Sequence, residues 1–148
     1  MKKFACAFFV AMLVCAPAIA QQPAEMIGRI QNIQGVASIQ RGGVTLPGAA
    51  GTALYLGDLI RTGKPGAVGI VLTDDTTISL GSGSELSLTD YAFAPKEGRF
   101  AFVMQMIKGT FSYISGQIVK LAPETARVRT PDATIAVRGT KLLIEIQE

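Results

Sequence analysis

The side chains that most often perform catalysis are missing from the part of this chain that is expected to function. Histidine is absent from all 148 residues, and Cys6 and Cys15 both lie within the first twenty. Histidine is the commonest general base, and serine or cysteine nucleophiles need such a base to be activated. Zinc would find only oxygen ligands after residue 20. We therefore expect no enzyme activity, no catalytic residue and no cofactor.

Acidic side chains offer the remaining routes to chemistry. Asp58, Asp74, Asp75 and Glu85 could supply the paired carboxylates that a glycosidase uses. Asp74 and Asp75 could also bind calcium together with nearby carbonyl oxygens. Adjacent residues of a strand point to opposite faces, so these two carboxylates converge only where the backbone turns. We interpret Asp74-Asp75 as a solvated turn and expect no metal site, with calcium kept open as the alternative.

Basic side chains gather toward the C-terminal end of the chain. Four of them stand near two predicted turns: Arg127, Arg129, Arg138 and Lys141. Together they could form a patch for a carboxylate or phosphate partner. We favour a structural interpretation, in which Arg138 folds back to pair with a turn acid such as Asp58 or Asp132 and fixes the local backbone.

The N-terminus has the three zones of a secretion signal. Lys2 and Lys3 begin it, an apolar run covers residues 4–14, and Ala18 and Ala20 precede a cleavage point at Gln21. This small-x-small spacing is what signal peptidase accepts, and the apolar run is shorter than a membrane span. We expect residues 1–20 to be a cleaved signal peptide, residues 21–26 a short tail, and the mature protein to be periplasmic or secreted.

Cleavage changes the cysteine and charge counts of the protein. The mature chain has no cysteine, so it forms no disulfide, and losing two lysines lowers the basic count from 14 to 12 against 11 acidic residues. The resulting formal charge of +1 gives no electrostatic reason to bind nucleic acid. Residues 27–148 are enough for one core. We expect one domain without a transmembrane segment.

Short alternations of apolar and polar residues are separated by turn formers every 8 to 12 residues. Val68, Ile70 and Leu72 alternate with their neighbours, and the period of two resumes at Ile78 and Leu80. All 16 glycines lie after residue 20, and no long helical pattern appears. This organisation is typical of an all-β sandwich, barrel or solenoid.

The second half of the chain is less regular. Residues 90–99 read as an exposed loop, in which Tyr91 and Phe93 share one face and are the candidate contacts for a sugar ring. Residues 100–107 form a nearly continuous apolar run, which favours a buried strand over a short helix. Residues 118–121 are predicted to form one of several further short strands.

Several segments, taken in order, resemble the FecR domain family, named after the periplasmic part of iron-citrate sensors that regulate extracytoplasmic sigma factors. The resemblance covers about Ile27 to Ile146, with a further match in the strand-turn-strand of residues 72–80. The motif residues that carry it are Gly57, Asp58, Thr62, Gly63, Thr130, Pro131, Arg138, Gly139 and Thr140. The family usually has aspartate-glycine where this chain has Asp74-Asp75, so a different turn is expected there.

The resemblance implies a β-solenoid-like, right-handed β-helix-like fold that acts by protein contact and has no catalytic residues. Family regulators carry a membrane helix before this domain, whereas a signal peptide precedes it here. We therefore expect a non-catalytic interaction or scaffolding module that docks onto another envelope protein through a sheet edge or face. Two alternatives remain open: a module that binds envelope glycan, and a periplasmic sensor component of sigma-factor signalling.

Overall fold

The computed structural model describes residues 24–147, which fold into ten strands, one short α-helix and two 3-10 turns. The predicted signal peptide, residues 1–20, and the start of the predicted tail lie outside the described residues. In chain order the elements are β1 Met26–Arg41, β2 Val44–Pro47, β3 Ala53–Tyr55, β4 Leu59–Leu72, β5 Thr77–Leu80, β6 Glu85–Ala94, η1 Pro95–Glu97, β7 Arg99–Ile114, α1 Gln117–Leu121, η2 Pro123–Thr125, β8 Ala126–Arg129, β9 Thr134–Ala136 and β10 Lys141–Ile146.

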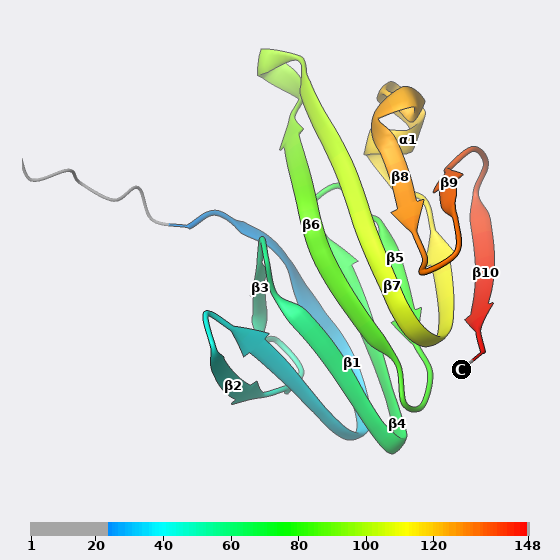
Figure 1. The fold of residues 1–148 in the computed structure, drawn as a ribbon. Helices are drawn as coiled ribbons and strands as arrows, with labels where there is room; N and C mark the ends of the chain where they lie inside the picture. Colours follow the sequence, from blue (N-terminus) through cyan, green and yellow to red (C-terminus); the bar gives the residue numbers. More distant parts are fainter. Residues whose placement is uncertain (1–23, 148) are drawn as a thin grey trace, which may run out of the picture.

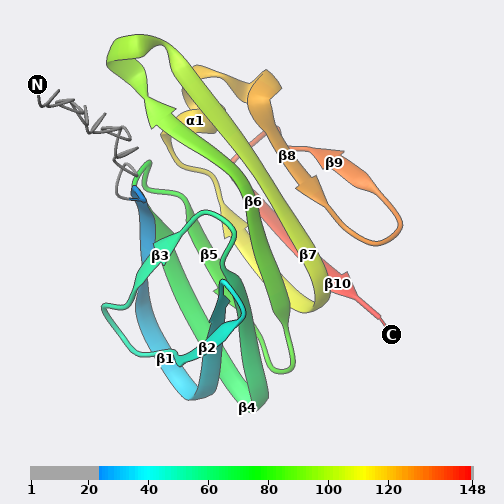
Figure 2. The ribbon, with the colours of Figure 1, turned by 60° about the vertical axis from the view of Figure 1, so that its left-hand side comes forward.

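Four strands close into a ring at the centre of the fold. β4 pairs with β5, β5 with β7, β7 with β6, and β6 pairs back with β4. Figures 1 and 2 show these strands wrapped around a common interior. The remaining strands extend from this ring: β1, β2 and β3 beyond β4, and β8, β9 and β10 beyond β7.

The pairing corrects the expected fold while confirming its class. The structure is all-β, as predicted, but nine of the ten strand pairs of residues 24–147 are antiparallel and only β7 with β8 is parallel. A right-handed β-helix stacks its strands in parallel, so the β-solenoid-like prediction is wrong. Alternation of apolar residues has the same period in either arrangement, and short turns favour antiparallel neighbours.

β7 is bent, and its two halves pair with different strands. Its first half, up to Lys108, lies between β6 and β8, whereas Gly109 to Ile114 lie between β5 and β10. Figure 1 shows the strand turning back at its lower end. Gly109 has a φ of 99°, and a Cβ there would collide with Ser84, so glycine permits the bend.

The predicted alternation of the central strands is confirmed by their burial. One face of β4, β5 and β6 supplies a core whose residues are at most 2% exposed: Val68, Ile70, Leu72, Ile78, Leu80, Leu86 and Leu88. Phe102, Met104 and Met106 of β7 complete it, so residues 100–107 form the predicted strand. Burying such side chains contributes roughly 1.5 to 3 kcal/mol each to folding.

Two local predictions are wrong. Residues 90–99 do not form an exposed loop, because β6 continues to Ala94 and a turn of 3-10 helix leads into β7. Residues 118–121 belong to helix α1 rather than to a strand. The backbone N–H groups of Gln117 and Ile118 are accepted by the backbone and side chain of Asp74, so a distant turn sets the start of this helix.

Candidate protein-interaction surface

Asp58, one of the motif residues, is fully buried and is held by an arginine that the sequence analysis missed. Arg41 donates from Nε to Oδ1 at 2.8 Å and from Nη2 to Oδ2 at 2.6 Å, and it also donates to the carbonyl of Ala53. The backbone N–H of Tyr55 is a further donor to Asp58, and the Arg41 guanidinium lies 4.5 Å from the Tyr55 ring centroid. This cluster joins the end of β1 to the turn before β4.

The predicted partner of Arg138 is therefore wrong. Asp58 pairs with Arg41, and among residues 24–147 no ion pair joins Arg138 to Asp58 or Asp132. Arg138 is exposed in the loop that leads to β10. Its neighbours Gly139 and Thr140 accept hydrogen bonds from the side chain and backbone of Ser115, so this segment is fixed by backbone contacts.

The other motif residues also occupy structural positions. The Thr62 hydroxyl donates to the carbonyl of Gly81 at 2.6 Å and accepts from the backbone N–H of Ser84, which ties β4 to the turn between β5 and β6. Gly57 has a φ of 87°. Thr130 and Pro131 begin the turn from β8 to β9, where Thr130 exchanges hydrogen bonds with Ala133, while Gly63 packs against the Val36 carbonyl.

The Asp74-Asp75 turn also differs from what the sequence predicts. Asp74 is not solvated but fully buried, and each carboxylate oxygen accepts two hydrogen bonds. Oδ1 accepts from the Thr76 backbone and the Tyr91 hydroxyl, and Oδ2 from the Thr76 hydroxyl and the Ile118 backbone. Asp75 follows with a φ of 67°, a conformation that glycine adopts more readily.

These contacts do not fit a calcium ion. Calcium needs six to eight oxygen ligands around one point, whereas the Asp74 oxygens already face four protein donors. Within residues 24–147, no group of three or more acidic, histidine or cysteine side chains is placed to hold a metal. The Asp74 carboxylate instead joins β6, the turn before β5 and the start of α1.

Tyr91 and Phe93, the predicted sugar contacts, lie together on β6 but are half-buried. The Tyr91 ring packs edge-on against Phe102, and Phe93 packs against Phe100. Burial raises the pKa of the Tyr91 hydroxyl well above its ordinary value. With Met26 and Leu56 these two residues line a groove of about 320 Å³ beside the start of β1.

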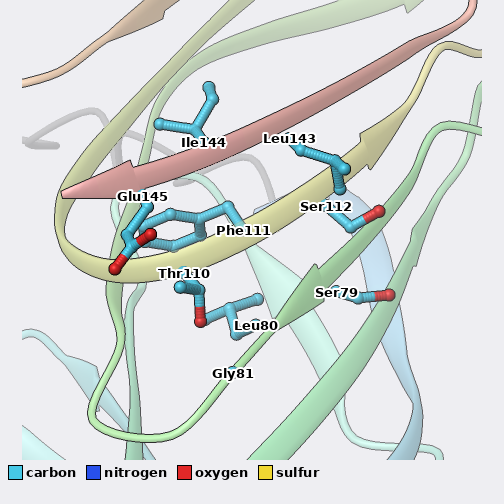
Figure 3. Close-up of a pocket in the computed structure, with 9 residues that line it drawn as sticks. All are labelled: Ser79, Leu80, Gly81, Thr110, Phe111, Ser112, Leu143, Ile144 and Glu145. Carbon is cyan, nitrogen blue, oxygen red and sulfur yellow. The ribbon is translucent and has the colours of Figure 1, made fainter.

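The outer surface of β5, β7 and β10 forms a larger groove, with a volume of about 520 Å³ (Figure 3). We call this surface the outer face and define it by the side chains that point away from the core: Ser79, Thr110, Ser112, Leu143 and Glu145, together with Gly81. Small side chains from β5 and β7 form its floor. Leu143 stands at its margin with 74% of its surface exposed.

The sequence model of one family, described as FecR protein, matches residues 58–148, which is more than half of the chain. The chain belongs to the FecR family. No curated protein and no solved structure matches it. The matched FecR region begins at Asp58 and contains Asp74 and the whole outer face, whereas Arg41 lies before it. No helix of this FecR-family chain within residues 24–147 has the length and apolar character needed to cross a membrane.

Proposed function

We propose that this FecR-family chain is an exported, non-catalytic interaction module of the cell envelope that binds another envelope protein on its outer face. The observation that carries the proposal is the exposed Leu143 beside a floor of small polar residues. Single exposed apolar side chains are common on protein surfaces, so the support comes from the combination of Leu143 with the adjoining groove of about 520 Å³. The two serines on the floor, Ser79 and Ser112, have short side chains that leave space for an apolar side chain of the partner.

The burial of two aspartates supports a structural rather than a catalytic role for their carboxylates. Asp58 and Asp74 are both fully buried, and their oxygens are taken by protein donors. A general acid or base must instead reach a substrate proton. Both aspartates therefore hold turns in place.

A second candidate function, glycan binding, is favoured by the groove that Tyr91 and Phe93 line. A sugar that stacks on an aromatic ring needs one face of that ring to be free. Tyr91 is half-buried, and its hydroxyl already contacts Asp74 and Thr73. The family membership supports the third possibility, a sensor component of sigma-factor signalling, and such a sensor would also act through a protein contact.

The test compares two substitutions on the outer face with one on a distant exposed site. The processed chain, affinity-tagged, is recovered from crosslinked envelopes as wild type, Ser112→Arg, Leu143→Glu and Val36→Glu. Val36 lies on β1 and is 73% exposed, which matches Leu143. We expect one envelope protein to be recovered with wild type and Val36→Glu and lost with both outer-face variants. Equal recovery with all four folded proteins would contradict the proposal.

A further inference from the structure

β10 has a free edge. It pairs with β7 along one side from Lys141 to Ile146, and no other strand of residues 24–147 pairs with its second side. In Figure 1 it is the outermost ribbon on the right. Natural edge strands are protected from pairing with another chain by proline, by bulges, by short length or by charged side chains, and β10 carries two charged residues, Lys141 and Glu145. β10 contains no proline, and its register with β7 is continuous, so the two charges decide which strand can pair with this edge.

The backbone groups that point to this edge follow from neighbouring hydrogen bonds. Thr110 of β7 accepts a bond from Gly81 on the β5 side, whereas Ser115 donates to Thr140 on the β10 side. Backbone groups alternate in direction along a strand, so Phe111 and Tyr113 direct theirs toward β10. Their partners there are Ile144 and Leu142. The N–H and C=O groups of Lys141, Leu143 and Glu145 consequently point away from β7, to the free edge.

The side chains of Lys141, Leu143 and Glu145 are complementary to the same three side chains on a second copy of the chain. Lys141, Leu143 and Glu145 are all exposed, and neither charged residue forms an ion pair with another described residue. In an antiparallel pair of two β10 strands centred on Leu143, each Leu143 faces its counterpart. Each Lys141 then faces the Glu145 of the other copy. Opposite charges placed directly across a strand pair stabilise it.

We propose that a second copy of this chain binds the β10 edge, which joins two molecules as a symmetric dimer through antiparallel β10 strands. Such a contact is isologous, because the same strand serves both molecules. Six outward residues and their backbone groups make a small interface, of the size that gives weak, concentration-dependent association. In this dimer the floor of the outer face, formed by Ser79, Thr110 and Ser112, stays open, whereas Leu143 and Glu145 at its margin meet the second copy.

Charge-reversal variants test the pairing and its register together. Lys141→Glu places two acidic residues opposite each other, and Glu145→Lys places two basic residues opposite each other. We expect each variant alone to dimerise at least tenfold more weakly than wild type in sedimentation velocity. An equimolar mixture of the two should recover the affinity, because each Glu then faces a Lys. The double variant, with both charges exchanged, should also dimerise like wild type.

Leu143→Pro tests the backbone contribution. The Leu143 N–H points to the free edge, so proline removes it without breaking the pairing of β10 with β7. We expect this variant to unfold at a temperature close to that of wild type and to be monomeric. The proposal is overturned if wild type stays monomeric at about 1 mM, where weak contacts of this size associate. It is also overturned if folded Leu143→Pro dimerises, or if mixing the charge variants restores nothing.

Discussion

Two buried aspartates, Asp58 and Asp74, each accept hydrogen bonds from groups far apart in the sequence. Asp58 collects donors from Arg41 and Tyr55, and Asp74 from Thr76, Tyr91 and Ile118. A buried carboxylate is costly unless it is fully hydrogen-bonded. Because several elements supply these donors, each aspartate fixes the relative position of the elements around it.

Asp74→Ala should destabilise the protein by about 3 kcal/mol or more, because it leaves four donors without their acceptor in a buried site. Chemical unfolding in urea measures the loss. Asp75→Gly is the matched control: the left-handed φ of 67° suits glycine, so the unfolding free energy should change by less than about 0.5 kcal/mol. Equal changes in unfolding free energy for the two substitutions would show that the Asp74 carboxylate does not hold these elements together.

Arg41→Ala should lower the free energy of unfolding by about 2 to 3 kcal/mol, because it leaves the Asp58 carboxylate buried and unpaired. Arg61→Ala removes an exposed pair with Glu85 and should cost less than about 1 kcal/mol. Arg138→Ala should change stability by less than about 0.5 kcal/mol, since Arg138 is exposed. A loss for Arg138→Ala as large as that for Arg41→Ala would favour the original sequence-based pairing.

Tyr113 makes stability depend on alkaline pH. Its hydroxyl is buried without a well-formed hydrogen bond, and this burial raises the pKa of Tyr113 to about 12, with the nearby Thr76 side chain lowering the pKa and the charge of Asp74 raising it. In the unfolded chain the pKa is about 10, so the unfolded state loses its proton first as pH rises. The contribution is fully present below about pH 10 and is lost between about pH 10 and 12, at up to about 1.4 kcal/mol per pH unit.

The measurement is a series of urea unfolding curves between pH 9 and the onset of alkaline unfolding, for wild type and Tyr113→Phe. Phenylalanine cannot ionise, so the variant should show a shallower fall over this range. Below about pH 9 the variant should be as stable as wild type or slightly more stable, because it no longer buries an unpaired hydroxyl. Identical slopes for the two proteins would contradict the role given to Tyr113.

Sequence alone could find the motif residues but not all of their partners. Asp58 and Thr62 were singled out, and the structure places both in hydrogen-bonded, buried positions. Arg41 was missed because it lies 17 residues before Asp58, and no local pattern marks a pair at that separation. Asp74 was read as solvated because two adjacent acids are usual in exposed turns. Its burial depends on Tyr91 and Ile118, which come from distant elements.

At the scale of elements, the strands with clean alternation were predictable and their pairing was not. Val68 to Leu72 and Ile78 to Leu80 show a period of two, and the structure buries the predicted face. That period is the same for parallel and antiparallel neighbours, so it could not choose the closed ring over a solenoid. Helix α1 was missed because five residues are too few to show helical periodicity, and Asp74 supplies its first hydrogen bonds.

Gly116 controls how α1 packs on the turn before β5. A Cβ at this position would collide with the backbone of residues 74–76, which cannot move without disturbing the Asp74 hydrogen bonds. Gly116→Ala should therefore destabilise the protein by about 1 to 3 kcal/mol in thermal or urea unfolding. Gly42→Ala meets no atom within 4 Å and should cost only the backbone strain of its positive φ, about 1 kcal/mol. A neutral Gly116→Ala would mean that the contact is not tight in solution.

At the scale of the whole molecule, the proposed export predicts a defined N-terminus. We propose that signal peptidase cuts after Ala20, so intact-mass measurement and N-terminal sequencing of the protein from the envelope fraction should find Gln21 first. Neither cysteine would then remain in the mature chain. Protein that retains Met1 and stays in the cytoplasmic fraction would contradict both the cleavage and the proposed location.

In the whole molecule, the polar groups that hold the turns lie apart from the exposed outer face. Arg41, Asp58 and Asp74 lie where turns and strand ends meet, whereas the outer face is carried by the regular parts of β5, β7 and β10. The ring of four strands fixes β5 against β7, and β10 adds the exposed Leu143. The surface is therefore presented by paired strands, whose relative positions are fixed by backbone hydrogen bonds.

Site-specific photo-crosslinking in intact cells decides whether another envelope protein binds the outer face. A photoreactive residue is placed at Ser79 or Ser112 on the floor of the outer face, and at Val36 or Val44 on exposed control positions of β1 and β2. We expect the outer-face positions to give a crosslink to one envelope protein and the control positions to give none. Crosslinks only from the control positions, or none from any position in a folded and exported protein, would contradict this expectation.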